Sequence, residues 1–167
     1  MQTILPSGAA NGIGRATAMH FHGLGWQVIG LDTDTEALAE LRGALPRESA
    51  LFLSCDVGRE SEVRNAFEGI GEWLGECPLD CLVNNAGIAD PVTGPLEELE
   101  LAEWQTWIDA SLTAAFLCSR SLLPFLRRGD GGTIVNISST RAVMSEPESF
   151  AYAAAKGGID ALTHAMA

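Results

Sequence analysis

Residues 2–14 read QTILPSGAANGIG, and they join a short apolar run to a cluster of glycines. A helical pattern of apolar residues over 13–24 follows, and Gly25 stands at its end. This order predicts a strand, a tight turn and a helix. Because glycine reaches positive φ and lets a backbone approach a phosphate at a helix N-terminus, the turn is a candidate pyrophosphate site. The candidate binding residues are Gly8, Asn11, Gly12, Ile13 and Gly14, although such a turn can also merely connect a strand to a helix.

The same order of strand and helix repeats along the chain. Short apolar runs predict further strands at residues 26–31, 51–54, 79–83 and 133–137. Helical patterns cover 34–43, 60–74 and about 102–126, and a last helix begins near residue 150. Apolar strands that alternate with helices are typical of a doubly wound, Rossmann-type α/β fold, a parallel sheet with helices on both faces. We expect one domain over residues 1–167, with its ligand beyond the carboxyl ends of the strands.

Asp32 closes the second predicted strand, 18 residues after Gly14. A carboxylate at this place accepts hydrogen bonds from the adenosine ribose and repels a 2′-phosphate, so the sequence favours NAD over NADP. No Lys or Arg occurs among residues 9–11, and Arg15 is the one basic residue close by. The alternative is that Asp32, like Asp34, caps the next helix.

Tyr152 and Lys156 stand four apart at the start of the last predicted helix and therefore share one face. An ammonium close to a phenol stabilises the phenolate, which makes the pair a candidate acid–base centre with Ser139. Without further context, such a pair is typical of an ordinary helix surface.

Five motifs together resemble the short-chain dehydrogenase/reductases, in the order that this family has them. The resemblance covers essentially the whole chain. The motifs are SGAANGIG at 7–14, Cys55-Asp56-Val57, Asn84-Asn85-Ala86-Gly87, IVNISS at 134–139, and Tyr152-Ala-Ala-Ala-Lys156.

The resemblance implies a hydride transfer between NAD and a secondary alcohol or ketone. Tyr152 would transfer the hydroxyl proton, Ser139 would hydrogen-bond the reacting oxygen, and Lys156 would hold the nicotinamide ribose and activate Tyr152. Asp56 and Val57 would contact the adenine. Asn84, Asn85, Ala86 and Gly87 would pack against the adenosine ribose and brace the glycine turn.

The resemblance also implies a homodimer or homotetramer, in which the long helix and the Tyr152 helix pair across a two-fold axis. Two positions depart from the family pattern. Ser111 stands where an asparagine normally anchors a water that links Lys156 to solvent, so the relay is weakened or completed by an additional water. Pro6 is expected to disturb the approach to the glycine turn, because proline lacks an N–H.

Composition excludes several kinds of partner. A formal charge of −12 repels nucleic acid and anionic membrane surfaces. The sequence has neither a secretory signal pattern nor an apolar stretch of the ~20 residues that span a bilayer, which favours a cytoplasmic protein. The four scattered cysteines are expected to be reduced, and no metal site is expected.

The apolar spacing of the last helix continues to Ala167 without a stop signal, so we expect the family's last strands and substrate lid to be absent and residues 133–137 to form an edge strand. Turnover by these 167 residues alone is not expected. Three hypotheses follow: part of a working oxidoreductase, an inactive module that still binds NAD, or a protein-interaction module.

Overall fold

Five parallel strands form a single sheet in the order β3-β2-β1-β4-β5. The computed structural model describes residues 1–144 and 146–167. The strands are β1 (Thr3–Pro6), β2 (Gln27–Asp32), β3 (Ala50–Ser54), β4 (Cys81–Asn84) and β5 (Thr133–Asn136). The predicted doubly wound α/β fold is confirmed, and the predicted strand bounds differ from these by two residues at most.

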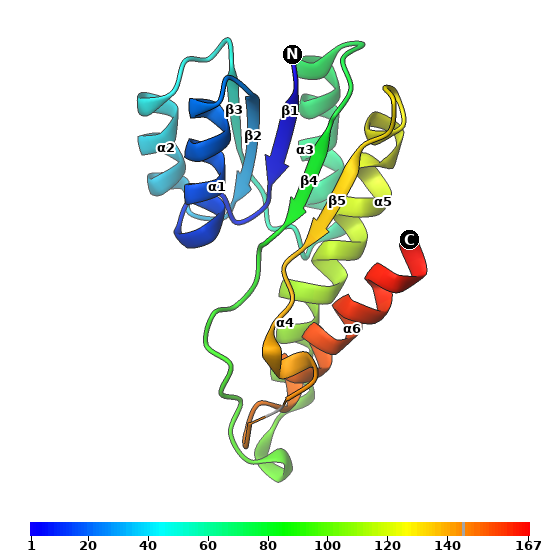
Figure 1. Cartoon of the computed structure of the whole chain (residues 1–167). Coiled ribbons are helices and arrows are strands. Elements are labelled where there is room, and N and C mark those ends of the chain that lie inside the picture. Colours follow the sequence, from blue (N-terminus) through cyan, green and yellow to red (C-terminus); the bar gives the residue numbers. More distant parts are fainter. Residues whose placement is uncertain (145) are drawn as a thin grey trace.

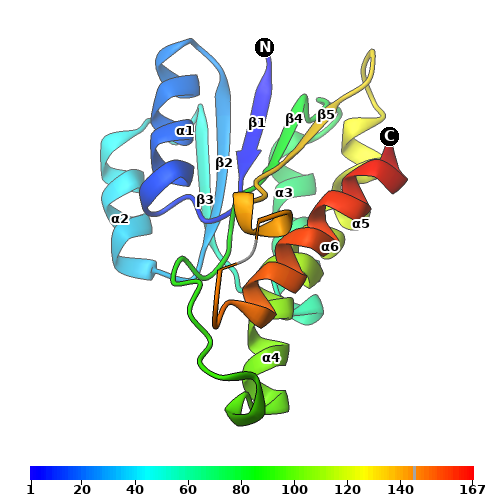
Figure 2. The ribbon, with the colours of Figure 1, turned by 60° about the horizontal axis from the view of Figure 1, so that its bottom comes forward.

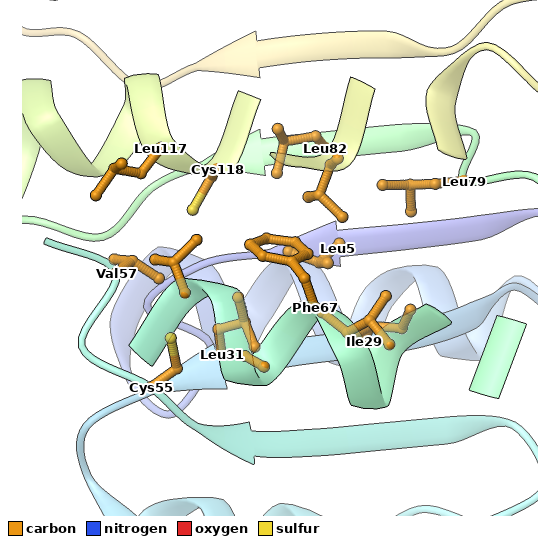
Figure 3. Packing of buried hydrophobic residues seen from close by; sticks show 14 of the residues in the cluster. Leu5, Ile29, Leu31, Cys55, Val57, Phe67, Leu79, Leu82, Leu117 and Cys118 are labelled. Atoms are coloured by element: carbon orange, nitrogen blue, oxygen red, sulfur yellow. The ribbon is translucent and has the colours of Figure 1, made fainter. Parts of the chain in front are cut away.

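Helices cover both faces of this sheet (Figure 1). One core cluster packs α1 (Gly12–Gly23) and α2 (Thr35–Ala44) against Ile4, Val28 and Phe52. The other packs α3 (Glu60–Leu74) and α5 (Ala114–Leu126) against Leu5, Ile29 and Leu82, with Phe67 at its centre (Figure 3). Adjacent strand residues thus supply opposite faces, which explains why the strands are continuously apolar.

The central strand β1 is buried along its whole length. Pro6 belongs to it and is opposite Val83 of β4, and the Ser7 N–H donates to the Val83 carbonyl at 3.0 Å. The expected disturbance at Pro6 is therefore wrong. Amides of a strand alternate between its neighbours, so the missing N–H lies on the β2 side and the bonds to β4 remain.

The predicted helix over 102–126 is interrupted, which corrects the sequence interpretation. It consists of α4 (Leu101–Ile108), a π-helical turn η2 (Asp109–Thr113) and α5. At this turn Leu112 lies against the backbone of α6 (Phe150–Met166), since a Cβ on Gly158 would be 2.6 Å from Leu112 Cδ2. A π-helical turn is a rare bulge inside an α-helix, and the apolar pattern of the sequence did not distinguish it from regular helix.

The last helix, α6, lies beside α4 and α5 in both views (Figures 1 and 2). Two short 3₁₀ turns, η1 (Leu96–Glu98) and η3 (Thr140–Ala142), lie in the loops that follow β4 and β5. Among the described residues, strand β5 pairs only with β4, so the predicted edge strand is confirmed. The central position of β1 brings the loops after β1, β2, β4 and β5 to one edge of the sheet.

Candidate active site

The turn after β1 can be formed only by glycine at several points. Gly8 and Gly12 have φ of +65° and +52°, which L side chains rarely adopt. A Cβ on Gly14 would lie 1.9 Å from the Gly8 carbonyl oxygen. The start of α1 is therefore pressed directly against the turn.

The segment after β4 braces this turn. The Ser7 hydroxyl accepts hydrogen bonds from the backbone N–H groups of Asn85 (3.1 Å) and Ala86 (3.0 Å). The Asn85 side-chain amide donates to the Ser7 carbonyl at 3.0 Å. Asn85 and Ala86 therefore brace the turn through Ser7, which was not among the predicted site residues although it lies inside the glycine motif.

The N-terminus of α1 has features that suit an anionic ligand. Asn11 is its N-cap residue, yet the Asn11 side chain does not cap α1 and donates instead to Asp34 Oδ2 at 3.1 Å. The first turn of α1 has no acidic residue, whereas those of α2 and α3 contain Glu36 and Glu60. The positive end of the α1 dipole is thus left for another negative charge.

Asp32 and Asp34 have separate roles. Asp34 caps α2, because its Oδ1 accepts from the Ala37 N–H at 3.0 Å, and this bond lowers the pKa of Asp34. Asp32 accepts from the Ala10 N–H at 2.8 Å and from the Asp34 N–H at 3.0 Å. The alternative that Asp32 is the helix cap is therefore wrong, and its carboxylate lies against the glycine turn.

Lys156 is buried, with 5% of its surface exposed. Its ammonium donates to the Ile137 carbonyl at 2.7 Å and lies 5.8 Å from the centre of the Tyr152 ring. Burial lowers the pKa of Lys156, and the nearby Asp160 carboxylate partly opposes that shift. Such a buried cation beside a phenol is typical of a functional site.

Tyr152 lies on α6, and Ser139 immediately precedes η3, the turn that packs against α6. The Tyr152 ring lies perpendicular to that of Trp107, with centroids 5.9 Å apart. Ser139 Oγ accepts from the Arg141 N–H at 3.2 Å and so caps η3. The sequence did not mark Trp107 as a site residue, because its place in the helical pattern is that of an ordinary buried residue.

Ser111 lies close to Lys156. A Cβ on Gly87 would be 3.1 Å from Ser111 Oγ and 3.9 Å from Lys156 Nζ. Ser111 is 2% exposed, and its hydroxyl has no hydrogen-bond partner within the described residues. The lysine and the hydroxyl therefore flank the same small space left by the glycine.

Other predicted residues have local partners. Asp56 accepts from the Gly58 N–H at 3.0 Å and from Arg59 Nε at 3.0 Å, and Val57 is part of the buried core. Asn84 donates to Asn136 Oδ1 at 2.7 Å and to Ser119 Oγ at 3.1 Å, so it links β4 to β5 and α5. The adenine and ribose contacts of these residues remain predictions.

Residues 1–144 and 146–167 contain no group of three His, Cys, Asp or Glu side chains arranged to hold a metal ion. None of the helices in these ranges combines the length and apolarity that a membrane crossing requires.

Residues 2–167 match the family model for short chain dehydrogenase. An uncharacterized oxidoreductase of Thermotoga maritima is 38% identical over 164 residues, which are 96% of this chain and 62% of that protein. A 3beta-hydroxysteroid dehydrogenase of Mediterraneibacter gnavus is 36% identical over 98% of this chain and 59% of its own length. The chain thus spans about three fifths of the length of these curated relatives.

Solved structures of other dehydrogenases are also similar to this chain. A short-chain dehydrogenase from Streptomyces avermitilis has a TM-score of 0.90 at 32% identity, covering 100% of this chain and 61% of its own. A serine dehydrogenase complexed with NADP+ has a TM-score of 0.89 at 26% identity, covering 99% of this chain and 65% of its own. The motifs that resemble this family lie at one edge of the sheet, and the family model matches nearly every residue. The chain therefore belongs to the short-chain dehydrogenase family.

Proposed function

We propose that this chain forms the cofactor-binding and catalytic part of an NAD-dependent oxidoreductase that acts on a secondary alcohol or ketone. The observation that carries the proposal is the buried Lys156 ammonium beside Tyr152, at the sheet edge that also holds the glycine turn. An ordinary surface pair at i and i+4 would leave both side chains in water.

The residues around the turn fit a dinucleotide. A Cβ on Gly12 would meet no atom within 4 Å, so the backbone is open to a ligand there, and the first turn of α1 offers N–H groups without an acidic side chain. Gly8, Ile13 and Gly14 would complete the pyrophosphate site with Asn11. Asp32 would accept the ribose hydroxyls, and its charge would disfavour a 2′-phosphate.

When bound, the nicotinamide accepts or supplies the hydride. Tyr152 exchanges the proton of the substrate oxygen, and Ser139 donates a hydrogen bond to that oxygen. The Lys156 ammonium stabilises the Tyr152 phenolate while its contact with Ile137 fixes its direction. Ser111 and Lys156 border the same space at Gly87, where a water bridging the two would replace the usual asparagine in the relay.

Assembly and setting complete the proposal. We propose a homodimer or homotetramer that uses the α5 and α6 faces, since Phe116 and Met166 are 45% and 41% exposed there. Light scattering of the intact protein at micromolar concentration tests this, and a monomer would contradict it. We also propose a cytoplasmic setting, because the four scattered cysteines lack the dense spacing of a secreted disulfide scaffold.

Tyr152→Phe in the intact protein tests the chemistry. It removes the transferable proton and leaves the ring, so turnover should fall at least ~10²-fold while NAD affinity barely changes. Lys156→Met should damage both, because Lys156 is assigned to the ribose as well. Turnover is followed by NADH absorbance with alcohols, sugars and steroids as substrates.

Unchanged turnover in Tyr152→Phe would refute the proposed mechanism. NAD binding without turnover of any alcohol by the intact parent protein would favour the alternative, an inactive NAD-binding or interaction module.

A further inference from the structure

Trp107 is buried, but not by packing into the core around the sheet. It is 8% exposed, yet among the described residues it belongs to neither of the two core clusters. It lies on α4, which packs against α6, and the two helices are side by side in both views (Figures 1 and 2). The contact between these helices therefore accounts for its burial.

The Tyr152 ring has two neighbours, an aromatic ring and an ammonium. The Trp107 ring is nearly perpendicular to it, with an angle of 88° and a centroid distance of 5.9 Å. The Lys156 ammonium lies 5.8 Å from the centroid of the same ring. Perpendicular aromatic pairs and cations near a ring are both favourable, so the two contacts restrict the side-chain torsions of Tyr152.

The two helices meet at two matched points. Trp107 and Ser111 are four residues apart, as are Tyr152 and Lys156. The rings of Trp107 and Tyr152 are in contact. Ser111 and Lys156 both border the space at Gly87. Helix α4 with its π-helical turn therefore presents one residue to each member of the candidate acid–base pair.

We propose that Trp107 is a positioning residue that fixes the Tyr152 ring and so directs its hydroxyl toward the substrate oxygen. This inference rests on the proposed role of Tyr152. Proton transfer requires the hydroxyl within hydrogen-bond reach of that oxygen, and a displacement of about 1 Å is enough to slow such a step strongly. A smaller, flexible side chain at position 107 leaves the ring free to turn away.

The test compares Trp107→Leu with Trp104→Leu in the intact protein. Trp104 is on the same helix and only half-buried, which makes it a matched control. Trp107→Leu should lower kcat roughly tenfold or more while the KM for NAD changes less than about twofold, since the cofactor contacts are untouched. Trp104→Leu should keep the parent kcat. Trp107→Phe restores a ring and should recover most of the turnover.

Rates are taken per folded molecule, below the melting temperature of each variant. Should Trp107→Leu not fold, Trp107→Met replaces it as the flexible variant without a ring. A merely structural role predicts lower melting temperatures with unchanged kcat, and that result would overturn the inference. Equal losses in Trp104→Leu, or no recovery in Trp107→Phe, would overturn it as well.

The Tyr152→Phe variant separates the two proposals. If Tyr152→Phe is inactive and Trp107→Leu retains the parent kcat, only the role of Trp107 fails. If Tyr152→Phe itself retains turnover, the proposed function fails.

Discussion

At the scale of single residues, Gly14 tolerates no side chain. A methyl group there would lie 1.9 Å from the Gly8 carbonyl oxygen, so either α1 or the turn must move. We expect Gly14→Ala to abolish measurable NAD binding and to lower the free energy of unfolding by about 1–3 kcal/mol, the usual effect of overpacking. Calorimetric titration with NAD and thermal unfolding followed by circular dichroism measure both.

Gly23→Ala is the matched control, because it lies on the same helix and a Cβ there meets no atom within 4 Å. It should leave NAD affinity unchanged. If Gly14→Ala binds NAD as tightly as Gly23→Ala does, the turn is not the pyrophosphate site.

The two neighbouring aspartates allow a second test at this scale. Asp32→Ala should narrow the preference for NAD over NADP, because it removes the charge that repels the 2′-phosphate. Asp34→Ala should leave the preference unchanged and cost about 0.5–2 kcal/mol of stability, since it removes the α2 cap. Dissociation constants for both cofactors decide the matter, and a parent protein that binds NADP as tightly as NAD would contradict the role of Asp32.

The sequence predicted the roles of some of these residues and not of others. The strand–turn–helix order located the glycine turn, but it could not tell which of Asp32 and Asp34 caps α2, because both types suit that position. The partner of Lys156 is the Ile137 carbonyl, a backbone atom that no residue type reveals. Trp107 was hidden for a similar reason, since burial against a helix and burial in the sheet core give the same pattern.

At the scale of elements, strands were easier to predict than the long helix. Continuous apolar runs such as β2 mark strands buried on both faces, whatever lies next to them. The π-helical turn Asp109–Thr113 could not be predicted, because it lies where Leu112 meets Gly158 of another helix. The sequence of each segment therefore predicted whether it forms a helix or a strand, but it did not predict where the long helix is interrupted.

The edge strand β5 provides a prediction for this 167-residue chain. Val135 on β5 is 40% exposed, and an unpaired apolar edge promotes association between chains. Val135→Lys should slow aggregation at micromolar concentration, as followed by light scattering. Val143→Lys is the control, since Val143 is 80% exposed but outside any strand. Equal slowing by both variants would show that general apolar exposure, and not the strand edge, causes the association.

At the scale of the whole molecule, Lys156 connects stability to pH. It is the only lysine among the 167 residues. Burial lowers its pKa in the folded chain below the ordinary value of 10.5. Between the two values the unfolded chain binds more protons, so the parent gains stability as pH rises through this window, and below the window the buried charge costs its full amount.

The Lys156→Met variant lacks the titrating amine, so its stability should not show this increase with pH. The free energy of unfolding of the parent minus that of Lys156→Met should increase from pH 7 to pH 10, measured by urea denaturation at each pH. A difference that is constant or falls with pH would mean that the folded chain does not disfavour the ammonium.

The central place of β1 also has a consequence for the order of biosynthesis. The strand made first pairs with β4, and the contact between Ser7 and Asn85 joins residues 78 apart. During translation the glycine turn must therefore wait for β4 to leave the ribosome before its brace can form. The strands β1 to β3 can pair earlier, with the β4 side of β1 still uncovered. A nascent chain halted before Asn85 should thus depend on chaperones and fail to retain NAD, because long-range parallel pairing is slow and exposes apolar surface while it is incomplete.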